Sequence, residues 1–153
     1  MTNPDKTTGK DDKFDLGRFI SAQEDDHAQA LSELRNGRKR SHWMWYIFPQ
    51  IDGLGSSATS RHFAIKSKEE AKAYLEHPLL GARLVECTET VFLIRERSAH
   101  DIFGYPDDLK FKSCMTLFEA LPGADSIFAR SLEKYFNGER DSRTLQLLER
   151  LSK

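Results

Sequence analysis

The chain has 153 residues, of which 39% are hydrophobic and 31% are charged, and its formal net charge at pH 7 is −1. This length is enough to bury more than half of the unfolded surface in one core, and the composition excludes collagen-like and wholly disordered classes. A net charge near zero excludes a global attraction to nucleic acid or membranes. We therefore expect no DNA partner, and any anion site must be local.

The cysteines and the N-terminal residues indicate a compartment. Cys87 and Cys114 lie far apart and form no CxxC pair, so neither a disulfide framework nor a zinc knuckle is predicted. The N-terminal segment has no apolar run, and the apolar run at 43–48 is far shorter than the roughly 20 residues that cross a bilayer. We expect a cytoplasmic protein with no membrane association.

The first part of the chain is predicted to be a tail followed by two helices. Residues 1–12 are polar and carry little apolar surface, which predicts a flexible N-terminal tail before a single helical domain over 13–153. Asp15 is expected to cap a short helix through Phe19. A second helix should bury one apolar face and end at Gly37.

Helical periodicity also dominates beyond residue 60. Ser67 and Glu70 form the S-x-x-E pattern that is typical of a capping box. The clearest helix follows Pro78, with an apolar stripe at spacings of four and three: Leu80, Leu84, Cys87, Val91 and Ile94. Further helices should end near Gly104, span 114–121, and begin at Asp125 and Asp141. Residues 63–67 alternate weakly like a strand. The predicted fold is all-α, a compact single-domain bundle of about six to eight short and medium helices.

The segment RKRSHWMWYIFPQIDGLGSS, residues 38–57, contains both tryptophans of the chain directly after a run of cations. Its apolar period fits a strand or a helix, and both faces are large and apolar, so most of 44–48 is expected to be a buried linker. Trp43 and Trp45 are interpreted differently, because an indole N–H needs a partner and an aromatic face beside arginine and lysine can stack on a flat ligand. Trp43, next to His42, Arg38 and Lys39, is the residue assigned to the ligand. His42 is the adjacent proton carrier in this interpretation.

The loop that follows is rich in glycine and serine. GLGSSA at 53–58 matches GxGxxA formally, but Pro49 and the helical pattern downstream do not fit a dinucleotide-binding unit. Two interpretations remain: an anion nest made by Gly53 and Gly55 with the Ser56 hydroxyl, or an ordinary turn that requires glycine. Gln50 would read the edge of a ligand by hydrogen bonds.

The segment 102–118, IFGYPDDLKFKSCMTLF, places two carboxylates and two lysines before an apolar helix. Asp107 and Asp108 are expected to cap that helix, or Asp108 and Lys110 face a cleft as a base and an anion-binding cation. Ser113 is either a ligand-binding hydroxyl or an ordinary helix residue. No two of the five histidines have the spacing of a zinc site, so no metal and no cofactor are expected.

SHWMWYIFPQIDGLG (41–55) and IFGYPDDLKFKSCMTLFEAL (102–121) resemble an uncharacterised family of small, mostly helical bacterial proteins, sometimes mislabelled calpastatin. The similarity extends through 73–89 and 134–148. It implies an all-α fold and no known activity. Calpastatin itself is disordered and repetitive, unlike this chain with its regular apolar pattern. Cys114 stands where the resemblance leads us to expect a serine beside Ser113.

The functional hypothesis is one pocket where the 41–56 and 105–113 segments meet. It would bind a nucleotide-like or other phosphorylated small molecule. Trp43 would stack on the flat part of this ligand, and its anionic part would be held by Arg38, Lys39, Lys110 and the backbone of 53–57. Any chemistry would be hydrolysis or transfer at a glycosidic or phosphate bond, with Asp108 as base and His42 as proton carrier. The alternative is a non-catalytic protein-interaction module that uses the aromatic 42–48 stretch as a hot spot.

Overall fold

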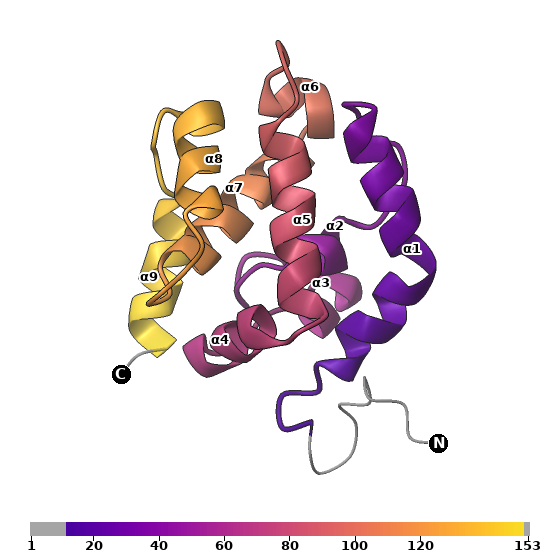
Figure 1. Cartoon of the computed structure of the whole chain (residues 1–153). Helices are drawn as coiled ribbons and strands as arrows, with labels where there is room; N and C mark the ends of the chain where they lie inside the picture. The colour runs from indigo at the N-terminus through magenta and orange to yellow at the C-terminus, as the bar shows by residue number, and fades with distance from the viewer. Residues whose placement is uncertain (1–11, 152–153) are drawn as a thin grey trace.

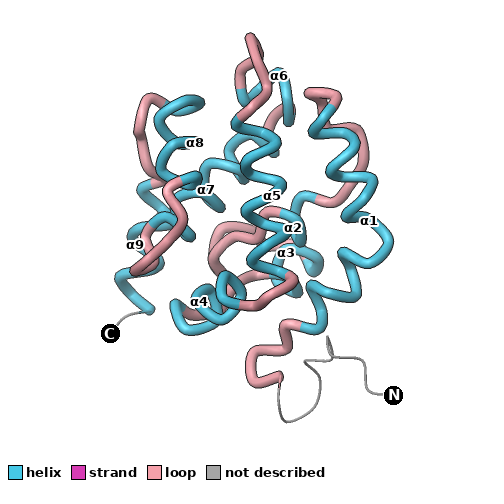
Figure 2. Tube along the Cα trace, in the orientation of Figure 1, coloured by secondary structure: helices cyan, strands magenta, loops and turns pink. Residues whose placement is uncertain are grey.

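The computed structural model describes residues 12–151, in which nine helices are joined by loops (Figure 1). In chain order they are α1 (Gly17–Arg35), α2 (Met44–Ile47), α3 (Ala58–Phe63), α4 (Lys68–Glu76), α5 (Leu80–Phe92), α6 (Ala99–Phe103), α7 (Asp107–Glu119), α8 (Ile127–Phe136) and α9 (Ser142–Leu151). Figure 2 shows helices and loops throughout this range, and the only pairing of β type there is an isolated parallel bridge between Ile51 and Ile65. The predicted all-α fold class is confirmed.

Helix α1 is one continuous helix of 19 residues, so the prediction of two helices here is wrong. The carboxylate of Asp12 accepts the backbone N–H groups of Leu16 and Gly17 at 2.6 and 2.8 Å. Asp15, the predicted cap, instead lies in the left-handed region with φ 54°. The helix therefore begins from a turn that includes Asp12, whereas residues 1–11 of the predicted tail lie outside the described part of the chain.

Helix α5 has the central place in the fold. It packs against α1, α4 and α8, and Figure 1 shows it standing between α1 on one side and α8 on the other. The residues of its predicted apolar stripe within the helix are buried, namely Leu80, Leu84, Cys87 and Val91. Burial of one large aliphatic side chain stabilises a fold by about 1.5–3 kcal/mol, so this stripe positions α5. Behind it, α7 packs against α6, α8 and α9.

The aromatic stretch forms the single turn of α2 and is mostly core. Trp43, Met44, Ile47 and Phe48 are buried. The Phe48 ring meets that of Phe111 nearly edge-on, with centroids 5.1 Å apart. The segments at 41–48 and 102–111, which are far apart in the sequence, are therefore fixed against each other through shared aromatic packing.

Side-chain caps define several helix starts. The Ser67 hydroxyl accepts the N–H of Glu70, as the S-x-x-E pattern predicts, but the Glu70 carboxylate binds Arg18 and the N–H of Lys66. A reciprocal capping box forms instead between Ser98 and Asp101 at the start of α6. No helix in the described range is long and apolar enough to cross a membrane.

Candidate functional site

The segment that joins α1 to α2 is held by one buried carboxylate, that of Glu33. Its Oε1 accepts the backbone N–H of Arg40 at 2.7 Å, that of Ser41 at 2.9 Å and the indole N–H of Trp43 at 2.9 Å. Its Oε2 accepts the hydroxyl of Ser41 and the side-chain amide of Gln29. Glu33 is 4% exposed. These donors fix the path of residues 40–43 and thereby the direction of the cations before them.

These hydrogen bonds also keep Glu33 ionised. Burial alone raises the pKa of a carboxyl group, but the donors from Ser41, Arg40 and Gln29 outweigh it and lower the pKa of Glu33 to about 2. The group therefore carries a full negative charge at neutral pH within the protein interior.

The first cationic feature is a bridge of two lysines over Asp107. Lys39 Nζ lies 2.8 Å from Oδ2 of Asp107, and Lys110 Nζ lies 3.0 Å from its Oδ1. Burial raises the pKa of Asp107, but the hydrogen bonds from Lys39 and Lys110 lower it below its ordinary value. Asp107 therefore carries two ammonium groups on one carboxylate, and Asp108 supplies a second carboxylate in the same first turn of α7.

Beside this bridge lies a surface hollow of about 320 Å³, the indole hollow, lined by Lys39, His42, Trp43, Met44, Trp45, Tyr46, Ser57, Thr59, Asp107 and Lys110. Lys110 Nζ stands 4.1 Å from the centre of the half-buried Trp45 ring, within the range of a cation–π contact. The sequence hypothesis placed a pocket where 41–56 and 105–113 meet, and this hollow has residues from both segments.

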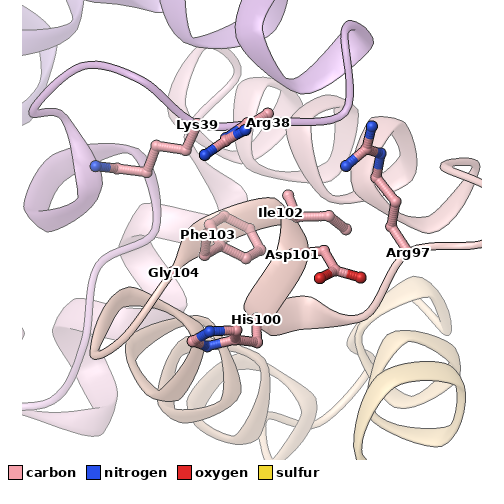
Figure 3. Close-up of a pocket in the computed structure, with 8 residues that line it drawn as sticks. All are labelled: Arg38, Lys39, Arg97, His100, Asp101, Ile102, Phe103 and Gly104. Atoms are coloured by element: carbon pink, nitrogen blue, oxygen red, sulfur yellow. The ribbon is translucent and has the colours of Figure 1, made fainter.

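A second hollow, the α6 hollow, has a volume of about 380 Å³ and is lined by Arg38, Lys39, Arg97, His100, Asp101, Ile102, Phe103 and Gly104. Figure 3 shows Arg38 and Lys39 side by side on the segment after α1, facing the residues of α6, with Arg97 on the segment before it. The backbone N–H of Lys39 donates to the carbonyl of Ile102 at 2.7 Å, which joins the two segments.

The charged groups of the α6 hollow are unequally paired. Within the described residues, no hydrogen bond or ion pair engages the guanidinium of Arg38 or that of Arg97. Asp101 is occupied by the capping box, and hydrogen bonds from Ser98, with a contribution from the charge of Arg97, lower its pKa. His100 Nδ1 lies 3.7 Å from Oδ2 of Asp108, whose side chain is 16% exposed. Two guanidinium groups without a hydrogen bond or ion pair, and an imidazole, therefore line this hollow.

The structure places three residues with predicted roles, and the role of Trp43 needs correction. Trp43 is 1% exposed, with its indole N–H bound to Glu33, so it presents no ring face to a ligand and Trp45 is the tryptophan at the surface. His42, the predicted proton carrier, lines the indole hollow, whereas Asp108, the predicted base, lies beside His100. The contacts of the two imidazoles with neighbouring side chains in the folded chain could not be derived from spacing.

The residues of the glycine-rich loop that were predicted to bind the ligand line neither hollow. Gln50, Gly53 and Gly55 line a space of only about 10 Å³ beneath Trp45, the size of one water molecule. The Cβ that Gly55 lacks would lie 2.7 Å from the Ser60 side chain, so this glycine serves close packing. Ser56 is exposed and lines neither hollow.

Ser113 also has a structural environment. It is 6% exposed, and its hydroxyl donates to the carbonyl of Leu109 at 3.1 Å and lies 3.2 Å from Asp141 at the start of α9. It therefore links α7 to α9 and does not face a hollow.

Burial also changes the case for the aromatic hot spot. Only His42 is exposed among residues 42–48, and Trp45 and Tyr46 are partly buried. The phenol of Tyr46 donates to Asp26 on α1. An interaction surface needs an exposed apolar patch, and most of this stretch lies in the core instead.

Sequence reasoning missed Glu33, Arg97, His100 and Asp107 as members of the site, and it named Trp45 as a possible stacking surface but gave the ligand to Trp43. Glu33 had a detectable signal, because an acidic residue between Ala30 and Leu34 on the apolar face of a helix requires buried partners. Asp107 also had one, since it precedes Lys110 by three residues on a helix. Nothing in the sequence brought Arg97 or His100 next to residue 38.

No group of three or more metal-ligating side chains occurs within residues 12–151. Cys87 and Cys114 are both buried free thiols. Burial raises the pKa of Cys87 to about 12 and that of Cys114 well above its ordinary value. Neither is a nucleophile at neutral pH, because the thiolate is the reactive form.

Comparison with known proteins places the chain in a family. The family described as "Protein of unknown function (DUF1810)" matches residues 13–148. A crystal structure of the conserved hypothetical protein Rv1873 from Mycobacterium tuberculosis is 51% identical in sequence, with a TM-score of 0.88, and the match covers 89% of this chain and 97% of that one. No curated protein matches the chain. The family anticipated from the 41–55 and 102–121 phrases is thus confirmed, and the chain belongs to DUF1810.

Proposed function

We propose that the protein binds a phosphorylated small molecule with a flat part, such as a nucleotide, across the two hollows. The observation that carries this proposal is the position of Lys39, which lines both of them. The α6 hollow, on one side, holds the guanidinium groups of Arg38 and Arg97, and the indole hollow, on the other, holds the Trp45 indole. A single ligand of modest size can therefore reach an anion-binding end and an aromatic end.

The α6 hollow supplies the anion-binding end. The guanidinium groups of Arg38 and Arg97 form no hydrogen bond or ion pair within the described residues, although the charge of Arg97 acts on the Asp101 carboxylate. A guanidinium matches the geometry of phosphate oxygens in pairs. The carboxylate of Asp101 opposes an anion, but it already accepts the N–H of Ser98. The cations outnumber it in this hollow, so the local field favours phosphate.

The indole hollow supplies the aromatic end. Trp45 is partly exposed, and the ammonium of Lys110 fixes one side of its ring. Stacking of one base on an aromatic side chain contributes about 1–3 kcal/mol. We assign the stacking role to Trp45, in place of Trp43.

The proposal extends to chemistry at the phosphate or glycosidic bond of such a ligand. His100 takes the role first given to His42, because it lines the α6 hollow and has the Asp108 carboxylate beside it. A carboxylate next to an imidazole can orient the ring. We place this activity in the cytoplasm, where buried free thiols such as Cys87 remain reduced.

The test is thermal unfolding and calorimetric titration with pyrophosphate, ribose 5-phosphate, AMP, ADP-ribose and adenosine. A ligand at a hundredfold its dissociation constant stabilises the fold by about 2.7 kcal/mol, a rise of roughly 5–10 °C for a chain of this size. Replacing Arg38 and Arg97 together by Gln should abolish the response to every phosphorylated ligand. Trp45→Ala should weaken AMP about tenfold or more and leave pyrophosphate unchanged.

The matched control is Arg95→Gln, a neighbouring exposed arginine outside both hollows. This variant should bind like the wild type. The proposal is wrong if no phosphorylated ligand moves the wild-type midpoint, or if the control loses binding as strongly as the Arg38 and Arg97 double variant.

A further inference from the structure

We propose that a groove between α4, α5 and the turn from α7 to α8 binds a basic amphipathic helix of a protein partner. We call it the acidic groove; it is lined by Lys72, Leu75, Glu76, Gly81, Ala82, Val85, Glu86, Glu89, Pro122, Gly123 and Asp125. Its volume of about 590 Å³ exceeds that of either hollow described above. In Figure 1 the turn between α7 and α8 descends beside α4 and the start of α5.

The middle of the groove is apolar. Leu75 and Val85 are partly buried and pack against the core, whereas Ala82 is exposed to solvent. Helices α4 and α5 approach each other closely at the floor of the groove. A Cβ at Gly81 on α5 would lie only 1.9 Å from the carbonyl oxygen of Leu75 on α4. A trough of this kind accepts the apolar side chains of a partner and removes them from water.

The rim of the groove is acidic on every element that forms it. Glu76 stands on α4, Glu86 and Glu89 on α5, and Asp125 on the turn, against the single cation Lys72. The ammonium of Lys72 lies 4.0 Å from Glu76, and both side chains are more than 60% exposed. Such an exposed pair contributes little. Glu86 lies 3.6 Å from Nε2 of His27, and Asp125 accepts the backbone N–H of Ile127, so Glu76 and Glu89 are the carboxylates most available for basic side chains of a partner. Charge complementarity therefore selects a partner with lysine and arginine around an apolar stripe.

The groove also restricts the secondary structure of its occupant. An extended segment that adds to a sheet needs an exposed strand edge, and residues 12–151 contain no strand. Recognition of a proline-rich helix needs a groove lined with aromatic rings, and no aromatic residue lines this one. A helix that lays apolar residues at spacings of three and four into the trough is the mode that remains.

This inference is independent of the proposed small-molecule site, because no residue of the acidic groove lines the α6 hollow or the indole hollow. A helix bound in the groove would cover the outer faces of α4 and α5. The two sites can therefore be tested in separate variants of the full chain.

The probe is a fluorescein-labelled peptide of about 15 residues with leucines on one helical face and lysines on the other. Fluorescence anisotropy should give a dissociation constant in the micromolar range that weakens as ionic strength rises. Ala82→Trp fills the trough from an exposed position and should weaken the peptide tenfold or more. Replacing Glu76 and Glu89 together by Gln should weaken it by about the same factor.

Two controls decide the outcome. A peptide of the same composition with its leucines scattered around the helix should bind at least tenfold more weakly, and equal binding would reduce the effect to net charge and overturn the proposal. Equal affinity of the wild type and Ala82→Trp would also overturn it. Light scattering after gel filtration tests whether a second copy of this chain occupies the groove. If the wild type is a dimer and Ala82→Trp is a monomer, the occupant is a second copy, and the proposal of a helical partner of different sequence is wrong.

Discussion

At the scale of single residues, Glu33 determines the geometry of the candidate site. Its buried carboxylate accepts donors from Arg40, Ser41 and Trp43, and the cations Arg38 and Lys39 lie at the start of the segment that it holds. A buried carboxylate that lost these donors would be strongly unfavourable. The site therefore depends on a residue that lines neither hollow.

We expect Glu33→Gln to reduce the free energy of unfolding by about 2–4 kcal/mol. An amide offers one acceptor oxygen in place of two. With that oxygen on the three donors that Oε1 accepts, the amide N–H groups face the Ser41 hydroxyl and the Gln29 amide, which Oε2 accepts in the wild type, and the charge that strengthens all five bonds is lost. Urea denaturation followed by circular dichroism measures the change. Glu24→Gln, at an exposed position of the same helix, should change stability by less than about 0.5 kcal/mol. Similar losses in both variants would contradict the role given to Glu33.

At the scale of elements, the packing of α1 shows why its continuity was missed. Gln23 interrupts the apolar stripe and suggests a break between two helices, yet it is 1% exposed. Its side-chain amide donates to the carbonyl of Tyr46 at 2.8 Å and to the hydroxyl of Tyr74 at 3.0 Å. A polar residue can lie on the buried face of a helix when other elements supply its hydrogen-bond partners, and the sequence pattern of one helix does not reveal those partners.

The contact of α4 with α5 depends on Gly81. A methyl group there would overlap the backbone carbonyl of Leu75, and a backbone atom cannot move aside as a flexible side chain can. We expect Gly81→Ala to destabilise the protein by about 2–4 kcal/mol despite the better helix propensity of alanine. A fall of the thermal midpoint by roughly 4–16 °C would report it.

Ala82→Gly is the matched control for this contact, since it changes the helix propensity at the next, exposed position alone. It should cost about 1 kcal/mol. If Gly81→Ala were as stable as the wild type, the close approach of α4 and α5 would be wrong, and with it the floor of the acidic groove.

At the scale of the whole molecule, two groups make stability depend on pH in the same direction. His27, between α1 and α5, has its pKa lowered from 6.5 by burial and then by the charge of Arg83. The pKa of Glu33 is lowered from 4.5 to about 2. In both cases the unfolded chain binds more protons than the folded one between the two pKa values, so stability falls as the pH falls.

We therefore expect two steps of lost stability on acidification from pH 7. The first lies below about pH 6.5 and comes from His27, and the second lies between about pH 4.5 and 2 and comes from Glu33. The second is on the order of 3 kcal/mol. Urea unfolding at a series of pH values measures both, and His27→Gln should remove the first step alone. A variant that retains that step would show that another group causes it.

The sequence by itself determined the all-α class, most helix positions and the family. The stripe of α5 is a local property, since residues three and four apart share a helix face whatever surrounds them. The stretches 41–55 and 102–121 were sufficient for the family, which matches residues 13–148. The alternative periods at 43–48 also already indicated that this segment is mostly core.

Only the tertiary structure decided which charged and aromatic side chains meet. The sequence alone does not distinguish Trp43 from Trp45. In the structure Trp43 is buried with its indole N–H bound to Glu33, whereas Trp45 lies at the surface beside Lys110. Arg97 and His100 reach the hollow at Arg38 because a backbone hydrogen bond joins Lys39 to Ile102. Contacts between residues some 60 positions apart depend on how the helices pack, and side-chain spacing along one helix carries no information about them.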